Sequence, residues 1–568
     1  MLTVLKTHLP TDTPIIGCEL APYVLLRRSD STLTTEDLPE GGQFEDGLCL
    51  RSRWYRSVNS RKVAVCSVHP NELATLQCIG CLKAKVPVHK SYHCTSKCFA
   101  ASWSNHKAMH ARPPNSGRDE NGQEEEVVCY RGSGGAAAGD SWVEVGRNRS
   151  YTPSPEDVGH ILKYEVTPFD SHNGTELETP TCVLTGRVIP IPTPPTRNML
   201  PVEGSASTSA PSNFTVLTYN VLADLYASTE MYGSYCPPWA LSWAYRKQSL
   251  LREVLSYQAD VLCLQEVQSD HFEDFFAPEL QKHGYTAVYK KKTAQVYTGS
   301  SYTIDGCATF FRADRFALVK KYEVEFNKAA LSLSEALSAA TQKKAALNRL
   351  LKDNVALIVV LEALEGPDPE AAASGKRQLI CVANTHIHAN PELKDVKLWQ
   401  VHTLLKGLEK IAASADIPML VAGDFNSMPG SAPHSLLANG RVEASHPELL
   451  TDPLGILRPP SKLCHQLPLV SAYTALAHPG VASSANPELH RQRVDPNTHE
   501  PIFTNYSADF NGTLDYIFYT ANSLVPVSLL ELPDKSVAAG QNGNGGLPNP
   551  QWGSDHIALM AEFAFKQQ

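Results

Sequence analysis

The chain has 568 residues, of which 42% are hydrophobic and 19% charged, and its formal net charge is −9. A chain of this size holds about three domains, and the ordinary hydrophobic content excludes wholesale disorder. The acidic balance excludes a positive coat over the whole protein, so any contact with nucleic acid must be local.

The sequence also excludes a membrane-spanning protein and a secreted protein. The apolar run at 355–361 is among the longest, and it falls far short of the ~20 residues that a membrane helix needs. Residues 1–10 contain charge and proline and no apolar run of the kind that a secretory signal carries. We therefore expect a soluble intracellular protein.

Two β-rich segments, 1–62 and 141–190, flank a cysteine-rich stretch. Both read as short strands with turns, which predicts one small β-sandwich with the cysteine-rich stretch inserted in a loop. A pair of unrelated β segments is the alternative. Pro, Gly, Ser and acidic residues predict linkers at 113–140 and 191–213.

The stretch at 63–112 has the spacing of a double zinc site. Four close pairs of ligand-type residues follow one another, and in a reducing compartment such a cluster indicates metal rather than disulfides. Eight ligands are enough for two closed tetrahedral sites, which suits structural Zn²⁺. The pairs are Cys66 and His69, Cys78 and Cys81, Cys94 and Cys98, and His106 and His110.

This stretch resembles the MYND zinc finger. The resemblance implies that the first and third pairs share one zinc and the second and fourth pairs share the other. His69 and His110 stand where that family usually has cysteine. MYND-like fingers bind short proline-containing peptides, so the resemblance implies a docking module; a purely structural knot is the alternative.

Residues 214–568 alternate short apolar strands with amphipathic helices, the pattern of a layered α/β domain. A helix is expected at 239–257, with Trp243, Leu250, Val254 and Tyr257 on one stripe. The alternation at 557–563 predicts the last strand.

Six of the predicted strands carry polar side chains of one chemical kind at or near their ends. Burying such strands is costly unless the polar ends meet a partner, and together they predict a cleft that holds a hard cation and a phosphate. Taken singly, a motif such as 423–426 could be an Asx turn, and 554–556 a helix N-cap. The residues are Asn220, Glu266, His386, Asp424 with Asn426, Asp515, and Asp555 with His556.

The ordered set resembles the endonuclease/exonuclease/phosphatase superfamily of Mg²⁺-dependent phosphodiesterases. The resemblance implies two packed mixed β-sheets flanked by helices, here preceded by the small β module with its zinc finger. The stretches at 219–226, 235–246, 304–311 and 392–398 look like the carbon-catabolite-repressor-type poly(A) deadenylases. That family's animal and fungal members carry leucine-rich repeats, whereas the finger resembles its plant members.

The resemblance implies a poly(A)-specific 3′-exoribonuclease that shortens mRNA tails and releases AMP, as a catalytic subunit of the large deadenylase complex. Its partners would be poly(A) RNA and the complex's second nuclease subunit, docked through the finger, with no membrane contact. It would reside in the cytoplasm, with mRNA-decay bodies as one location, and in the nucleus.

Site roles follow from side-chain chemistry together with this resemblance. Glu266 and Asn220 are expected to hold Mg²⁺, with Asp555 reaching a second Mg²⁺ and Mn²⁺ as a substitute. Asp424 is the expected base that orients or deprotonates the attacking water. Asn426 is expected to fix the position of that water or of the phosphate. Asp515 is expected to hold His556 in one tautomer toward the phosphate, and His386 to stabilise the developing charge.

Base selection is expected from a different pair. The resemblance implies that the 3′ adenine lies between Pro391 and Phe510. A turn proline and a packed aromatic are the alternatives. The lysines at 290–292 could steer phosphates, and a solvated loop is the competing interpretation.

Two other functions remain open on the sequence alone. One is an adaptor with an inert nuclease domain whose finger recruits partners. The other keeps the fold but acts on another substrate, as a DNA-repair endonuclease, an inositol-polyphosphate phosphatase or a dinucleotide phosphatase.

Overall fold

The computed structural model describes residues 2–28, 31–37, 44, 47–58, 66–68, 74, 76–78, 81, 90–93, 96–108, 110, 141–202, 213–297, 302–335, 337, 339–364, 378–457, 459–477, 490–539 and 545–566. The chain forms two compact units, Met1–Thr193 and Pro194–Gln568. No helix in these ranges has both the length and the apolarity to cross a membrane.

Outside the cysteine-rich stretch, the described residues of the first unit form two antiparallel sheets. One has the order β1 (Leu2–His8), β2 (Tyr23–Arg28) and β3 (Ser31–Thr34). The other has the order β10-β8-β4-β7, with β9 paired to β8. Its strands are β4 (Leu48–Ser57), β7 (Trp142–Gly146), β8 (Ile161–Asp170), β9 (Thr175–Glu176) and β10 (Thr181–Arg187).

Strand β4 precedes the cysteine-rich stretch, and it pairs with β7 and β8, which follow that stretch. The two flanks therefore share one sheet, and buried side chains such as Trp54 and Tyr164 join one core with residues of the three-stranded sheet. Two 3₁₀ turns, Thr35–Asp37 and Pro155–Asp157, complete the unit.

The cysteine-rich stretch is described in part. It contains β5 (Leu76–Gln77) paired with β6 (Tyr92–His93), followed by helix α2 (Ser96–Ala108). The expected linker at 113–140 lies outside the described residues.

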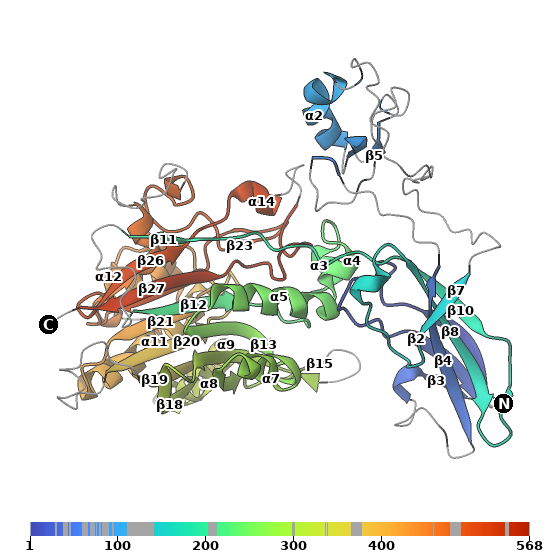
Figure 1. Cartoon of the computed structure of the whole chain (residues 1–568). Helices are drawn as coiled ribbons and strands as arrows, with labels where there is room; N and C mark the ends of the chain where they lie inside the picture. The colour runs from blue at the N-terminus through green and yellow to red at the C-terminus, as the bar shows by residue number, and fades with distance from the viewer. Residues whose placement is uncertain are drawn as a thin grey trace. The chain divides into compact units, whose positions relative to one another are not determined.

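The second unit is built on two mixed sheets (Figure 1). The seven-stranded sheet has the order β11-β26-β27-β12-β13-β17-β14, and only β12 and β13 run parallel. Its strands are β11 (Met199–Pro201), β12 (Phe214–Asn220), β13 (Val261–Gln268), β14 (Tyr285–Lys291), β17 (Asp305–Arg312), β26 (Leu524–Leu530) and β27 (Leu559–Phe565).

The six-stranded sheet has the order β18-β19-β20-β21-β25-β22, in which only β20 and β21 are parallel. Its strands are β18 (Phe316–Glu325), β19 (Val355–Ala363), β20 (Leu379–His386), β21 (Met419–Asp424), β22 (Leu469–Ser471) and β25 (Asp515–Thr520). Two short hairpins, β15 (Val296–Tyr297) with β16 (Tyr302–Thr303) and β23 (Asn505–Tyr506) with β24 (Asn511–Gly512), lie outside the sheets.

The sheets pack face to face, because one buried cluster takes side chains from both, such as Val216 and Phe563 from the first and Val382 and Ile517 from the second. Helix α5 (Trp243–Tyr257) covers the other face of the seven-stranded sheet through Leu250. The remaining face of the six-stranded sheet is covered by α8 (Phe326–Glu335), α9 (Ala340–Leu350), α11 (Lys394–Ser414) and α12 (Ala432–Asn439).

Shorter helices and turns connect these elements. They are α3 (Thr229–Tyr232), α4 (Pro238–Leu241), α6 (Ser269–His271), a π-helical turn (Phe272–Phe276), α7 (Ala277–Lys282), α14 (Lys535–Ala539) and the 3₁₀ turns Pro447–Thr451, Pro460–Lys462 and Ala472–Ala477.

Three sequence expectations differ in detail from the structure. The helix expected at 239–257 is two helices, α4 and α5, because Ser242 between them has extended backbone with ψ 142°. The last strand begins at Leu559 instead of 557, although its alternate residues enter the intersheet core as expected. The expected linker 191–213 contributes β11, and Arg197 there is buried and donates to the carbonyls of Glu531 and Ala558.

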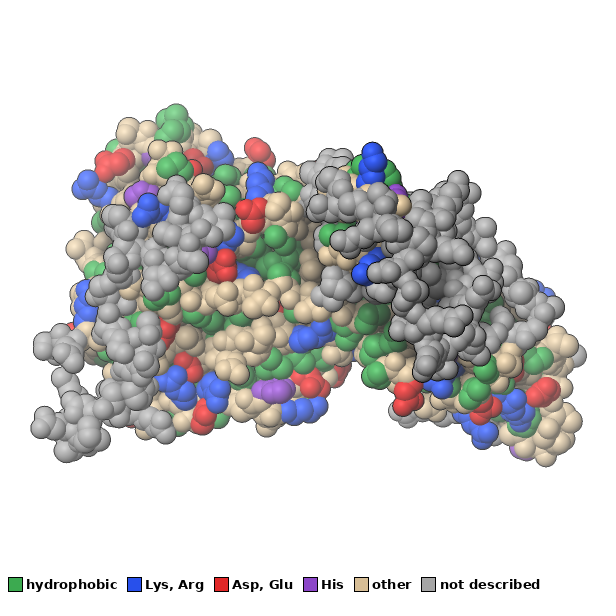
Figure 2. All heavy atoms as spheres, turned by 45° about the horizontal axis from the view of Figure 1, so that its top comes forward, with side chains coloured by type: hydrophobic (Ala, Val, Ile, Leu, Met, Phe, Trp, Pro, Cys, Tyr) green, Lys and Arg blue, Asp and Glu red, His purple; other side chains and the backbone are tan. Residues whose placement is uncertain are grey.

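Charged side chains of both signs are interspersed on the face drawn in Figure 2, and the described residues there form no extended basic patch. This distribution agrees with the expectation that any nucleic-acid contact is local.

Candidate functional site

The polar residues singled out in the sequence meet at one end of the two sheets. His386 and Asp424 end the parallel strands β20 and β21 as register partners, and Asp515 begins the antiparallel strand β25 opposite Asp424. Asn220 ends β12, and β27 beside it is antiparallel, so His556 just before β27 lies at the same end. Strand direction therefore brings residues far apart in the chain into one site.

Asn220 joins the two sheets. Its Nδ2 donates to Oε1 of Glu266 at 2.9 Å and to Oδ2 of Asp424 at 3.0 Å, and its Oδ1 accepts from the backbone N–H of Leu222. Asn220 therefore bridges the two carboxylates through its amide nitrogen; its oxygen keeps a second lone pair, and its expected role as a metal ligand stays a prediction.

The backbone is strained around these side chains. Among the described residues, three of the five non-glycine residues with positive φ belong to the site: Leu222, Glu266 and Asn426. Such conformations cost of order 1–3 kcal/mol each and persist only where the surrounding fold imposes them. Gly423, with φ 145°, allows a close approach of β21 to β20, since a Cβ there would lie 2.0 Å from the carbonyl oxygen of Thr385.

The surroundings of Glu266 oppose the negative charge of its carboxylate. Burial raises its pKa, and the carboxylates of Asp305 and Asp555 raise it further, against the lowering effect of Lys292. Its second oxygen accepts from the backbone N–H of Ala223 at 3.0 Å.

Asp515 and His556 form a buried pair. Nδ1 of His556 lies 2.7 Å from Oδ2 of Asp515, which also accepts from the hydroxyl of Thr504 at 2.6 Å. Burial lowers the pKa of His556, but the charges of Asp515, Asp555 and Asp424 outweigh it and leave that pKa well above its ordinary value. Both ring nitrogens are then protonated, and Nε2 lies 3.7 Å from Asp424.

Asp424 lies at the centre of the site. Burial and the charge of Asp515 raise its pKa to about 7, although His556, Asn220 and the backbone N–H of Asn426 lower it. A carboxylate with a pKa in this range can accept a proton near neutral pH, which suits a general base.

His386 is neutral and faces Asn426. Burial, and then the positive charge of Lys292, hold the pKa of His386 well below its ordinary value. Nδ2 of Asn426 donates to the carbonyl of Ile387 at 2.9 Å and lies 3.0 Å from Nε2 of His386. The amide therefore donates to Nε2, so this arrangement makes His386 a residue that orients Asn426, rather than a direct donor through Nε2 to a substrate.

Asp555 is held at the edge of the cluster. Its Oδ2 accepts from the Tyr232 hydroxyl at 2.9 Å and from Nδ2 of Asn505 at 3.1 Å. Its charge raises the pKa of Glu266, although no direct contact joins the two carboxylates among the described residues.

The two residues expected to hold a base lie in separate loops. Pro391 is exposed between β20 and α11, whereas Phe510 is half-buried beside Gly512 and Met428. Their joint action on a base stays a prediction.

The donor set fits a hard divalent cation. The carboxylates of Asp424 and Asp515 belong to one group of ligand-type atoms within 4.8 Å of one another, in which the protonated His556 is a neighbour and no metal ligand, and Glu266 is coupled to Asp424 through Asn220. One oxygen of Asp515, Oδ1, is buried and accepts no hydrogen bond from the described residues. Several buried carboxylates face few cationic groups here, and oxygen ligands of this kind suit Mg²⁺ or Mn²⁺.

Several residues that build the site were not expected from sequence. Lys290 and Lys291 end strand β14 and Lys292 follows it, instead of forming a solvated loop: Lys292 is buried and pairs with Asp305 at 2.8 Å, while Lys290 pairs with Glu323 and Glu325. Lys397 donates to the carbonyl of Asn426 at 2.7 Å. The lysine cluster was visible in the sequence, but its buried acidic partner was not.

The finger holds one complete cluster of four potential metal ligands. Ligand atoms of Cys78, Cys81, His106 and His110 lie within 4.8 Å of one another, and Sγ of Cys81 is 3.2 Å from Nε2 of His106 and 3.3 Å from Nε2 of His110. Ligands bound to one zinc at ~2.3 Å (S) and ~2.0 Å (N) lie about 3.5 Å apart, so the cluster is consistent with a zinc site.

A second cluster contains Cys66, Cys98 and His93. Sγ of Cys66 lies 3.6 Å from Sγ of Cys98, and Nδ1 of His93 lies 3.9 Å from the latter. The other two expected ligands, His69 and Cys94, lie outside the described residues. His93, adjacent to Cys94 in the chain, was not expected; burial lowers its pKa and so favours the neutral form that binds metal.

Comparison with known proteins adds independent findings. Residues 217–556 match the Endonuclease/Exonuclease/phosphatase family, and residues 65–112 match a family described as "zf-MYND-like zinc finger, mRNA-binding".

Among curated proteins, the chain is 54% identical to Carbon catabolite repressor protein 4 homolog 1 of Arabidopsis thaliana, over 99% of this chain and 98% of the relative. It is 32% identical to the CCR4-Not complex 3′-5′-exoribonuclease subunit Ccr4 of Schizosaccharomyces pombe, over 64% of this chain and 51% of the relative. The crystal structure of ANGEL2, a 2′,3′-cyclic phosphatase, is 29% identical with a TM-score of 0.48 and covers 65% of this chain and 98% of its own.

Proposed function

This chain belongs to the Endonuclease/Exonuclease/phosphatase family and, within it, to the plant carbon catabolite repressor protein 4 homologues, and from this premise we propose that it is a Mg²⁺-dependent 3′-to-5′ exoribonuclease. Its substrate is the poly(A) tail of mRNA and its product is AMP. The name of the fission yeast relative, an exoribonuclease subunit of the CCR4-Not complex, supports both the activity and membership of such a complex.

One observation carries the proposal. The acidic cluster of Asp424, Asp515 and His556 is joined by Asn220 to Glu266 at the shared end of two sheets. An inert adaptor has no need to hold several carboxylates at the cost of burial and backbone strain.

Glu266 is the proposed metal ligand, and Asp555 is available to a second ion. A bound Mg²⁺ supplies Lewis-acid stabilisation of the charge that develops on the phosphate. Mn²⁺ has the same preference for oxygen ligands and is proposed to substitute.

The chain's own residues then position and deprotonate the nucleophile. Asp424, with its pKa near 7, accepts the proton of the attacking water. Asp515 fixes the imidazolium of His556, whose Nε2–H faces the phosphate oxygens, and His386 holds the amide of Asn426. Pro391 and Phe510 are proposed to flank the terminal adenine.

A cleavage time course tests the function. Labelled oligo(A) and oligo(C) of equal length are incubated with the full chain and Mg²⁺, and then with EDTA. We expect AMP release one nucleotide at a time from oligo(A), slower cleavage of oligo(C), and none with EDTA. Equal rates on both oligonucleotides would favour a general nuclease, and no cleavage with any divalent metal would favour the adaptor.

The finger is proposed to hold two structural Zn²⁺ and to dock the second nuclease subunit of the complex. The description of its family as mRNA-binding favours a second candidate, direct contact with the message. Pull-down of the second subunit and binding of non-adenylated RNA, each compared between the full chain and its Cys78→Ser/Cys81→Ser variant, separate the two.

A further inference from the structure

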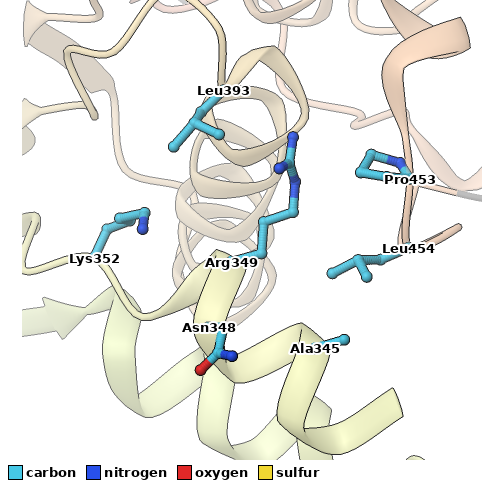
Figure 3. Close-up of a pocket in the computed structure, with 7 residues that line it drawn as sticks. All are labelled: Ala345, Asn348, Arg349, Lys352, Leu393, Pro453 and Leu454. Atoms are coloured by element: carbon cyan, nitrogen blue, oxygen red, sulfur yellow. The ribbon is translucent and has the colours of Figure 1, made fainter. Parts of the chain in front are cut away.

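A cavity of about 360 Å³ lies outside the cluster of catalytic residues. Its walls come from helix α9, from the segment that leads into α11 and from the loop that holds Pro453 and Leu454 (Figure 3). Ala345, Asn348, Arg349 and Lys352 line it from α9 and just beyond, at the helical spacing that places them on one face. Its volume is within the range of small-ligand sites, ~300–1,000 Å³.

The cavity combines apolar walls with cations. Leu393, Pro453 and Leu454 supply apolar surface, while Arg349 lies between them and Lys352 stands on the other side (Figure 3). The guanidinium of Arg349 is fixed by two bonds to the buried Asp395, at 2.6 and 2.8 Å from its Nε and Nη2, so its Nη1 takes no part in that pair. The ammonium of Lys352 forms no ion pair with another described residue.

Three connections place this cavity next to the catalytic cluster. Leu393 is two residues after Pro391, which limits their Cα atoms to about 7 Å apart. Asn354, two residues after Lys352, donates to the carbonyl of His386 at 3.1 Å. On the first turns of α11, Asp395 holds Arg349, and Lys397 donates to the carbonyl of Asn426.

The electric field of the cavity also reaches the site. Burial lowers the pKa of His388 to about 4, and the charge of Lys352 is the next cause of that shift. Lys352 is therefore close enough to His388, two residues beyond His386, to act on the strand end where the phosphate is expected.

We propose that this cavity binds an upstream nucleotide of the RNA strand whose 3′ end lies in the catalytic site. The base packs on Leu393, Pro453 and Leu454, and a backbone phosphate meets Lys352 and the free edge of Arg349. Apolar surface beside cations is the chemistry that single-stranded nucleic acid needs, because each nucleotide offers a flat base and a negative charge. The inference rests on the proposed function and extends it, because it predicts a dependence of the enzyme on substrate length.

The test compares substrates that can and cannot reach the cavity. kcat/KM of the full chain is measured for the dinucleotide ApA and for a 20-residue oligo(A), with Lys352→Ala, Leu454→Asp and the wild type. We expect each variant to lower kcat/KM on the long substrate about five- to tenfold, through KM, and to leave ApA within about twofold. Lys352→Ala should also flatten the slope of log KM against log salt by ~0.7, the value for one lost phosphate contact on a single strand.

Lys344→Ala is the matched control, since it removes one positive charge from an exposed position of the same helix that does not line the cavity. It should behave as the wild type on both substrates. Lys352→Ala and Lys344→Ala both leave the ion pair between Arg349 and Asp395 intact. A difference in activity between these two variants is therefore not explained by a folding defect.

Binding keeps the inference separate from the proposed function. In an Asp424→Ala background, anisotropy of labelled 20-residue oligo(A) gives the affinity with and without Lys352→Ala. If Lys352→Ala lowers the affinity for oligo(A) and the wild type shows no cleavage, the cavity is supported as a nucleotide site and the proposed reaction is overturned. The cavity is not a nucleotide site if Lys352→Ala equals the wild type in both affinity and cleavage. An equal loss of kcat/KM on ApA and on the long substrate would also overturn it. The same results would follow if a protein partner occupied the cavity instead of RNA.

Discussion

The catalytic end of the two sheets and the zinc finger are two polar clusters of opposite construction. In the first, carboxylate, amide and imidazole groups stand on the ends of buried strands and are joined by hydrogen bonds. In the second, thiol and imidazole groups come from the two-residue strand β6, from helix α2 and from the segments around them. The fold supports the first cluster, whereas the metal itself must support the second.

The ligand chemistry follows the same division. Oxygen ligands suit a Mg²⁺ ion that keeps water and substrate in its shell, and a strained, rigid frame leaves room for them. Sulfur and imidazole ligands close the zinc shell and leave no open position. We therefore expect that substitutions in the first cluster abolish cleavage and change the stability of the fold little. Substitutions in the second cluster should lower the stability of the finger and change cleavage little.

The largest expected effect is at the catalytic carboxylates. Glu266→Ala or Asp424→Ala should lower kcat on oligo(A) by about 10³-fold, equivalent to about 4 kcal/mol of barrier, because a metal ligand or the base is lost. Single-turnover cleavage measures the loss, and circular dichroism should show an unchanged fold. Asp314→Ala removes a carboxylate paired with Arg312 on the surface and serves as the control. Wild-type rates in both site variants would refute the assignment.

A smaller loss is expected at the residue that holds the imidazole. Asp515→Asn should lower kcat by about 10²-fold, because His556 loses the charge that raises its pKa and orients its ring. The affinity for oligo(A) should change little. Thr504→Val removes the hydroxyl that donates to the same carboxylate and accepts from the backbone N–H groups of Leu514 and Asp515, and it should cost less because the Asp515 charge remains. The pair has no role in the reaction if Asp515→Asn keeps more than half of the wild-type rate.

The pH dependence should show an acid limb set by Asp424. Asp424 acts as a base only when deprotonated, and its pKa is raised to about 7, so the active fraction falls as pH falls below that value. kcat should drop about tenfold per pH unit on the acid side and level off above it. A pH–rate profile at saturating Mg²⁺ checks the direction; a rate that rises on acidification would contradict the role of Asp424.

The smallest effect on catalysis is expected from the finger. Cys78→Ser/Cys81→Ser should lower the zinc content from two ions to one and expose 66–110 to protease, because the cluster loses both thiolates. Cleavage of free oligo(A) should stay within about twofold of the wild type. Cys49→Ser/Cys182→Ser, at cysteines outside both clusters, should change neither property. A tenfold loss of cleavage would mean that the finger contributes to the active site.

Local patterns allowed much of this protein to be predicted. Alternating apolar strands that end in Asn, Glu, His and Asp indicated a buried sheet with a polar edge, and paired Cys and His residues indicated zinc. Both patterns involve residues that are close together in the sequence. The period of a strand and the spacing of metal ligands can therefore be recognised from the sequence alone.

Only the tertiary structure decided how these groups pair. Strand registers and loops, which no local period encodes, bring together Lys292 and Asp305, Asn505 and Asp555, and Thr504 and Asp515. The break of the helix at Ser242, the edge strand β11 and the cavity beside Leu393 likewise depend on packing between distant segments. Residue type and spacing specify which chemistry the chain can offer, whereas burial and the direction of each strand determine which donor meets which acceptor and hence the charge that each group carries.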